Sequence, residues 1–88
     1  MGDVAVLIRL MPRSVETDME GIARAVRASL PAGVTVRGVQ VKDIAYGLKS
    51  LLVSIVMKDE GGILDSTEHA LAKIPGVESV EVMEEGLL

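Results

Sequence analysis

The spacing of apolar and polar residues predicts six secondary-structure elements, and the first is a strand. The run from Val4 to Met11 is β-branched and aliphatic, and it ends at Pro12, which cannot donate a hydrogen bond into a sheet. Apolar side chains fall on both faces of this run. We therefore expect the strand to occupy a central position in a sheet.

A helix is predicted next, and its start lies at the sequence Thr17-Asp-Met-Glu20. This spacing is typical of a capping box, in which the Thr17 hydroxyl accepts a hydrogen bond from the Glu20 amide and the Glu20 side chain reaches back. The run Pro31-Ala-Gly33 ends the helix. Apolar side chains recur between these signals at helical spacing, at Met19, Ile22, Ala23, Val26 and Leu30.

Two further strands are predicted in the middle of the chain, separated by a short interruption. Residues 34–42 are dense in valine and alternate, with polar breaks that favour a position near a sheet edge. Residues 43–47 interrupt the alternation and are expected to form a loop. The alternation resumes from Leu48 to Met57. One face of this strand is mainly apolar, and the other, which is half polar, is expected to be the open side of the sheet.

The second half of the chain repeats the strand, helix, strand order of the first half. Residues 58–62 predict a turn, residues 63–74 a helix that Pro75-Gly76 ends, residues 77–83 a short strand and residues 84–88 a tail. The order strand, helix, strand, strand, helix, strand is typical of the ferredoxin-like βαββαβ arrangement. We therefore expect an α+β fold, a four-stranded antiparallel sheet with two helices on one face.

The composition narrows the function classes. A chain of 88 residues predicts one domain, and no cysteine means no disulfide and no thiolate metal site. A net charge of −4 and a single aromatic residue argue against nucleic acid as a direct partner, since that partner calls for basic and stacking side chains. No apolar run is long enough to span a membrane, and Met1-Gly-Asp3 lacks the basic start of a secretory signal. We expect a cytoplasmic protein that does not bind membranes.

Few residues of the chain suggest a catalytic, metal-binding or anion-binding site. His69 is the one histidine, and without a second histidine or a cysteine we expect it to be exposed and not to bind a metal. Gly61-Gly62 precedes a predicted helix and could hold an anion there, but a plain turn is the preferred explanation of the pair. No set of nucleophile, base and orienting group is visible, so we expect no cofactor and no bond-making chemistry.

The segment from Lys42 to Lys49 stands apart because it holds Tyr46, the only aromatic residue of the chain. Tyrosine is an efficient anchor in protein interfaces, with a large rigid ring and a polar tip. Gly47 would let the backbone turn sharply and direct that ring outward. The alternative is that Tyr46 fills the core at the base of a loop, and the residues alone favour neither.

The run Tyr46-Gly-Leu-Lys49, followed by an aliphatic strand and an acidic turn ending at Glu60, resembles the family of translation elongation factor 1-beta in its short archaeal form. Eukaryotic members carry an aromatic residue followed by Gly, Ile and Lys at this place. The end of the first strand at Met11-Pro12 and the run Val77-Glu-Ser-Val80 are also similar to archaeal members. The resemblance covers essentially the whole chain.

This resemblance implies a guanine-nucleotide exchange factor, with residues 1–88 as a single exchange domain. The implied partner is the translational GTPase elongation factor 1-alpha, which must release GDP and bind GTP during protein synthesis. The residues implied to contact the GTPase are Ala45, Tyr46, Gly47, Lys49 and Leu87.

The C-terminus departs from the eukaryotic pattern that the resemblance brings with it. In eukaryotic members the loop aromatic and a lysine next to the last residue act toward the switch and magnesium region of the GTPase. Leu87 occupies the position of that lysine here. A neutral side chain cannot replace the cation electrostatically. We therefore expect exchange to depend on distortion of the switch region by the loop that carries Tyr46.

Two other function classes remain open at this point. A small-molecule-sensing module of the ACT type shares the predicted element order and would use Gly61-Gly62 to hold an amino acid. A structural or interaction protein would instead bind a partner on the open sheet face, which includes Leu48, Leu52 and Val56.

Overall fold

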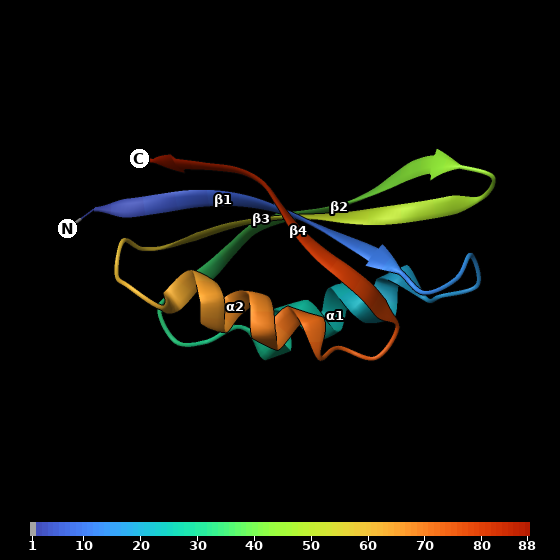
Figure 1. Cartoon of the computed structure of the whole chain (residues 1–88), viewed down its shortest axis with the longest axis horizontal. Coiled ribbons are helices and arrows are strands. Elements are labelled where there is room, and N and C mark those ends of the chain that lie inside the picture. The colour runs from blue at the N-terminus through green and yellow to red at the C-terminus, as the bar shows by residue number, and fades with distance from the viewer. Residues whose placement is uncertain (1) are drawn as a thin grey trace.

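The computed structural model describes residues 2–88 and confirms the predicted order of elements. It contains strands β1 (Asp3–Pro12), β2 (Val34–Ala45), β3 (Leu48–Lys58) and β4 (Val77–Leu87), with helices α1 (Met19–Ser29) and α2 (Ile63–Ala72). The strands form one antiparallel sheet in the order β2-β3-β1-β4. Both helices cover the same face of this sheet (Figure 1). The fold is therefore the expected ferredoxin-like α+β arrangement.

The central position predicted for β1 is confirmed. It pairs with β3 on one side and β4 on the other, and Ile8 is the partner of both Val53 and Val82. Its side chains are alternately buried against the helices and half-buried on the open face. Pro12 ends the strand opposite Val77, next to a register shift. A residue without an amide hydrogen is tolerated at such an end.

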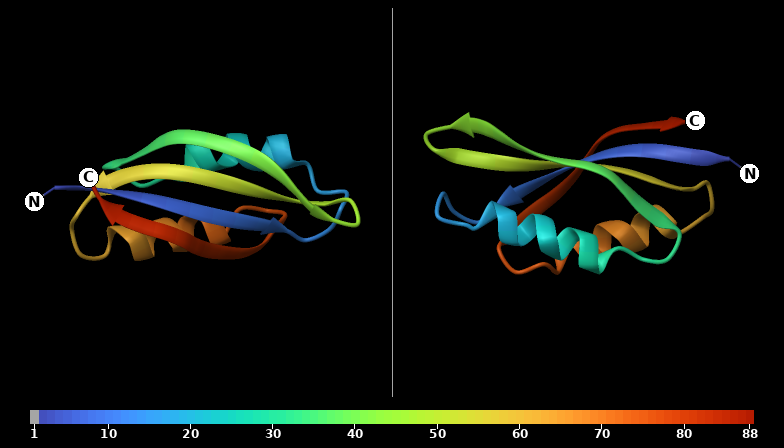
Figure 2. Two further views of the ribbon diagram at one scale, coloured as in Figure 1. Left: turned by 90° about the horizontal axis from the view of Figure 1, so that it is seen from above. Right: turned by 180° about the vertical axis from the view of Figure 1, so that it is seen from behind.

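The core is a single aliphatic layer between the helices and the sheet. Its buried members come from β1, β3, both helices, the segment before β4 and the first residue of β4, and they include no aromatic residue. They are Val4, Val6, Ile8, Leu10, Ile22, Val26, Leu51, Val53, Ile55, Met57, Leu71, Ile74 and Val77. The opposite sheet face carries no helix in either view of Figure 2, so the predicted open side of β3 is confirmed.

The capping box predicted at Thr17 is wrong. The N-cap of α1 is Asp18, and no side chain makes a capping hydrogen bond there. The Thr17 hydroxyl instead accepts a hydrogen bond from the Ser14 amide at 3.2 Å, while the Thr17 amide donates to the Ser14 carbonyl at 3.3 Å. The preceding turn therefore occupies the hydroxyl that the helix would need. At its other end α1 stops at Ser29, because the residue before Pro31 is driven out of helical geometry.

Three predicted boundaries differ from the structure by two residues or more, two of them at strand ends. The expected loop of residues 43–47 shrinks to a two-residue turn, because β2 continues to Ala45. The expected tail of residues 84–88 is largely strand, because β4 continues to Leu87 and pairs there with Val4. Side chains in both extensions are exposed, so no buried face imposes an alternation on the sequence. Helix α2 ends at Ala72, two residues before the predicted Ile74.

The edge strand β4 is acidic. It carries Glu78, Glu81, Glu84 and Glu85, and its pairing with β1 shifts register at two places. Glu81 also forms an ion pair across the sheet with Arg9, at 2.9 Å between the guanidinium Nη2 and the carboxylate Oε1. Because both side chains are partly exposed, this pair contributes only a small fraction of the stability.

Candidate functional site

The hairpin formed by β2 and β3 projects beyond the helices and gives the molecule its elongated shape. The principal extents are 42 × 20 × 17 Å, and the hairpin forms one end of the long axis (Figure 1). Every residue from Val41 to Gly47 is exposed. We call residues 41–49 the hairpin tip. It holds four of the five residues implied by the resemblance: Ala45, Tyr46, Gly47 and Lys49.

The turn at the hairpin tip has two residues, because Ala45 and Leu48 are paired on either side of it. Tyr46 has φ 55° and Gly47 has φ 80°. Positive φ at both positions is the pattern of a type I′ turn, whose twist matches that of the flanking strands. Among residues 2–88, Tyr46 is the one residue other than glycine with a positive φ. A tyrosine held in this conformation costs about 1 kcal/mol.

Tyr46 is fully exposed, with a relative accessibility of 101%. The alternative that it fills the core is therefore wrong. The only aromatic ring of the chain lies at the end of the projecting hairpin, on a backbone conformation that tyrosine disfavours. Strained backbone of this kind persists where the surrounding structure enforces it and is frequent at functional sites. The hairpin tip is the strongest candidate site on both counts.

Gly47→Ala is expected to lower the unfolding free energy by about 1 kcal/mol, because a Cβ is disfavoured at positive φ. No atom lies within 4 Å of the position that this Cβ would take, so the cost comes from the backbone alone. Gly38→Ala, on the same hairpin with equally free space and no positive φ, is the matched control. Thermal unfolding should show a lower midpoint for the Gly47 variant only. Equal midpoints for both variants would contradict the turn assignment.

Lys49 is exposed on β3, directly across the hairpin from Asp43. Between Asp43 and Ala45 the register shifts, so Ile44 is an extra residue in β2. Such a bulge increases the local twist of a strand. Val41 and Ile44 are 44% and 45% exposed, and sequence reasoning missed both. A strand valine such as Val41 normally indicates a core, and Ile44 fell in the expected loop of residues 43–47, where it was not singled out.

Leu87, the fifth implied residue, lies at the opposite end of the molecule. It pairs with Val4, which on its other side pairs with Met57 at the far end of β3. Leu48, beside the turn, is nine positions away from Met57 on that strand, a distance of about 30 Å along the sheet. Figure 1 shows the C-terminus and the hairpin turn at opposite ends. The structure therefore does not bring Leu87 together with Tyr46.

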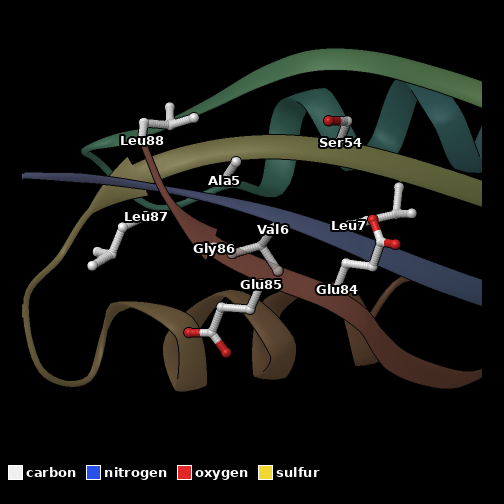
Figure 3. Close-up of a pocket in the computed structure, with 9 residues that line it drawn as sticks. All are labelled: Ala5, Val6, Leu7, Ser54, Glu84, Glu85, Gly86, Leu87 and Leu88. Atoms are coloured by element: carbon white, nitrogen blue, oxygen red, sulfur yellow. The ribbon is translucent and has the colours of Figure 1, made fainter.

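The C-terminal segment borders a shallow cleft with Ala5, Leu7 and Ser54 (Figure 3). Within it the side chains of Glu84 and Glu85 point to opposite sides of the sheet. The Leu88 amide donates a hydrogen bond to the Asp3 carbonyl at 2.9 Å, which extends the ladder to the last residue. Leu87 and Leu88 remain 75% and 69% exposed. This end is thus an ordered strand end that presents two leucines and two carboxylates.

The remaining candidates show no arrangement for chemistry. His69 is exposed on α2, and within residues 2–88 no group of three or more His, Asp or Glu side chains could hold a metal ion. Gly62 is the N-cap of α2 with φ 89°, so the backbone conformation alone accounts for a glycine there. Neither helix in the described part of the chain has the length and apolar character needed to cross a membrane.

Comparisons with known proteins show the family to which the chain belongs. The family model of the EF-1 guanine nucleotide exchange domain matches residues 5–87. Elongation factor 1-beta of Methanosarcina mazei is 44% identical over 85 residues, which are 96% of each chain. Elongation factor 1-beta of Halorubrum lacusprofundi is 40% identical over 88 residues, 100% of each chain.

A solved structure adds evidence on the fold alone. The C-terminal domain of the MgtC protein from Mycobacterium tuberculosis superposes with a TM-score of 0.63 at 19% identity, covering 99% of this chain and 89% of that one. The family match and the two relatives span nearly the whole chain and include the hairpin tip. The chain therefore belongs to the family of the EF-1 guanine nucleotide exchange domain, with the archaeal elongation factor 1-beta proteins.

Proposed function

We propose that residues 1–88 act as one exchange domain, which promotes GDP release and GTP binding on elongation factor 1-alpha during protein synthesis in the cytoplasm. Membership of the exchange-domain family supports the activity. The observation that carries the proposal is Tyr46, a fully exposed aromatic ring on a strained turn at the end of a projecting hairpin. Such a residue is suited to enter a partner's surface.

The exchange factor needs no bond-making chemistry of its own. It accelerates release by binding the distorted or nucleotide-free state of the GTPase more tightly than the GDP-bound state. The coupling is reciprocal, so incoming GTP weakens the factor's binding and frees it for another cycle. The paired strands of the hairpin suit this task, because they hold Tyr46 at a defined position from which it can contact the GTPase.

The proposed contacts at the two ends of the molecule fall on different regions of the GTPase. Tyr46 and Leu87 are separated by about 30 Å, so they cannot both reach one bound magnesium ion. Leu87 is neutral, and its neighbours Glu84 and Glu85 are acidic. The C-terminal end therefore offers no cation to compete for the magnesium position. Distortion of the switch region is assigned to the hairpin tip, and the C-terminal end serves as a second contact.

The ACT-type alternative is not supported. The family match covers residues 5–87, and elongation factors 1-beta that are 40–44% identical match 96–100% of the chain. The Gly61-Gly62 pair, which that alternative required as an amino-acid site, has a backbone explanation at Gly62. We do not carry this alternative further.

The test is release of a fluorescent GDP analogue from elongation factor 1-alpha. Substoichiometric amounts of this protein should accelerate release many-fold in the presence of excess unlabelled GTP. Because the factor is regenerated in each cycle, the rate should rise with its concentration and then saturate. Bovine serum albumin at the same concentration is the control for non-specific effects. A release rate unchanged by excess protein would contradict the proposed function.

A further inference from the structure

A groove lies between the hairpin tip and the loop that joins β1 to α1. In both views of Figure 2 this loop runs alongside the hairpin end. The groove has a volume of about 380 Å³, and its walls come from segments far apart in the sequence. Val41 and Lys49 line it from the hairpin side, and Val15, Asp18 and Glu20 line it from the side of the loop and α1.

Exposed apolar side chains gather at this end of the molecule, and two of them, Val15 and Val41, line the groove. Seven large apolar residues are exposed among residues 2–88, and the ones at this end are Val15, Val41, Ile44 and Tyr46. Val15 is 61% exposed although it stands in a polar loop. Pro12 and Met19, buried and half-buried, add apolar wall. Apolar surface gathered at one end of a small domain marks a site that a partner covers.

Acidic side chains outnumber basic ones among the residues that line the groove. Asp18 and Glu20 lie exposed on the α1 side, and Lys49 lies on the hairpin side. Asp18 approaches Arg24 only at 3.9 Å, with both side chains more than 70% exposed. That contact is weak, so the Asp18 carboxylate remains available to a partner. A groove with part-apolar walls and two carboxylates on its α1 side is complementary to an apolar side chain that has a lysine or arginine next to it.

We propose that this groove is a further contact surface for elongation factor 1-alpha and takes an apolar side chain flanked by a basic residue. The inference rests on the proposed function. We assign the groove to the same partner because it is continuous with the hairpin tip, since Val41 and Lys49 belong to both. The tip and the β1–α1 loop then hold a protruding segment of the GTPase from two sides.

The test measures binding of the full chain to nucleotide-free elongation factor 1-alpha by titration calorimetry. Val15→Asp should weaken binding about tenfold or more, because it places a charge in an apolar contact. Thr35→Asp is the matched control, since it adds the same charge at an exposed position near the start of β2. It should bind as the unaltered protein does. Both sites are exposed, and thermal unfolding should verify that both variants fold.

A second variant tests the charge. Asp18→Asn combined with Glu20→Gln should weaken binding at low salt and flatten its salt dependence. Unchanged affinity of Val15→Asp would overturn the groove assignment. An unchanged salt dependence of the double variant would overturn the proposal that the bound apolar side chain has a basic residue next to it. If the unaltered protein still accelerates GDP release in either case, the proposed function stands. If it neither binds nor accelerates release, both proposals fail.

Discussion

Tyr46→Asn is expected to slow the GDP release that this protein promotes by about 30-fold or more, and at the same time to raise its thermal stability. The loss follows from removing an exposed aromatic anchor, which is typically worth about 2 kcal/mol or more in an interface. The gain follows from the backbone: Tyr46 has φ 55°, and asparagine before glycine is favoured in a type I′ turn. Relief of roughly 1 kcal/mol should raise the unfolding midpoint by about 4–8 °C in a domain of this size.

Tyr46→Phe is the matched control for this variant. It keeps the ring and the strained backbone and removes only the hydroxyl, so we expect most of the exchange activity and an unchanged midpoint. Release of the fluorescent GDP analogue and thermal unfolding measure the two properties independently. Wild-type exchange by Tyr46→Asn would exclude the hairpin tip as the contact. A lowered midpoint would exclude the strain at the turn.

Ile8→Ala is expected to lower the unfolding free energy by about 3–4 kcal/mol. Ile8 is 0% exposed at the middle of β1, between Val53 of β3 and Val82 of β4. Its removal leaves a cavity that neighbours from three strands cannot close without breaking their pairing. Domains of this kind have only about 5–15 kcal/mol of stability, and this core is thin and lacks aromatic residues. A substantial share of the stability should therefore be lost.

Leu7→Ala provides the control, because Leu7 is the adjacent residue of β1 and faces the open side of the sheet, where it is half-buried. It should cost about 1 kcal/mol or less, since no closed cavity forms. Urea unfolding followed by circular dichroism gives both values. Similar losses for the two variants would mean that the open face is covered in solution and would contradict the single-layer core.

Sequence periodicity predicted the fold well wherever one face of an element is buried. The central place of β1 followed from its apolar content on both faces, and the open side of β3 followed from the half-polar set that includes Ser54. Both helices were identified from their apolar spacing, and both pack on the core through residues of that pattern, such as Val26 and Leu71. Burial imposes the pattern, so the pattern reports burial.

The pattern failed where nothing is buried. The ends of β2 and β4 are held by backbone hydrogen bonds that any residue except proline can make, so their extent left no trace in the side chains. The start of α1 was missed for another reason, since Ser14 competes for the Thr17 hydroxyl. Tyr46 was identified as a candidate because it is the only aromatic residue, but its exposure depends on the two-residue turn.

The candidate site was less predictable than the fold. The sequence identified Tyr46 and Leu87 as candidates but could not place them about 30 Å apart. That distance depends on the lengths of β2 and β4, which were predicted too short. Val15 could not be identified as a site residue from the sequence for a related reason. Its neighbour across the groove is Val41, and only the folded chain brings the β1–α1 loop under the hairpin.

The acidic edge of the sheet has a consequence for how copies of this protein behave toward one another. The outer side of β4 carries free backbone amides and carbonyls, which in a flat apolar strand would recruit the same strand of a second molecule. Two copies of β4 would bring Glu78, Glu81, Glu84 and Glu85 against their counterparts, and the register shifts bend the strand away from a straight template. These four glutamates thus also protect the β4 edge of the sheet against edge-to-edge aggregation.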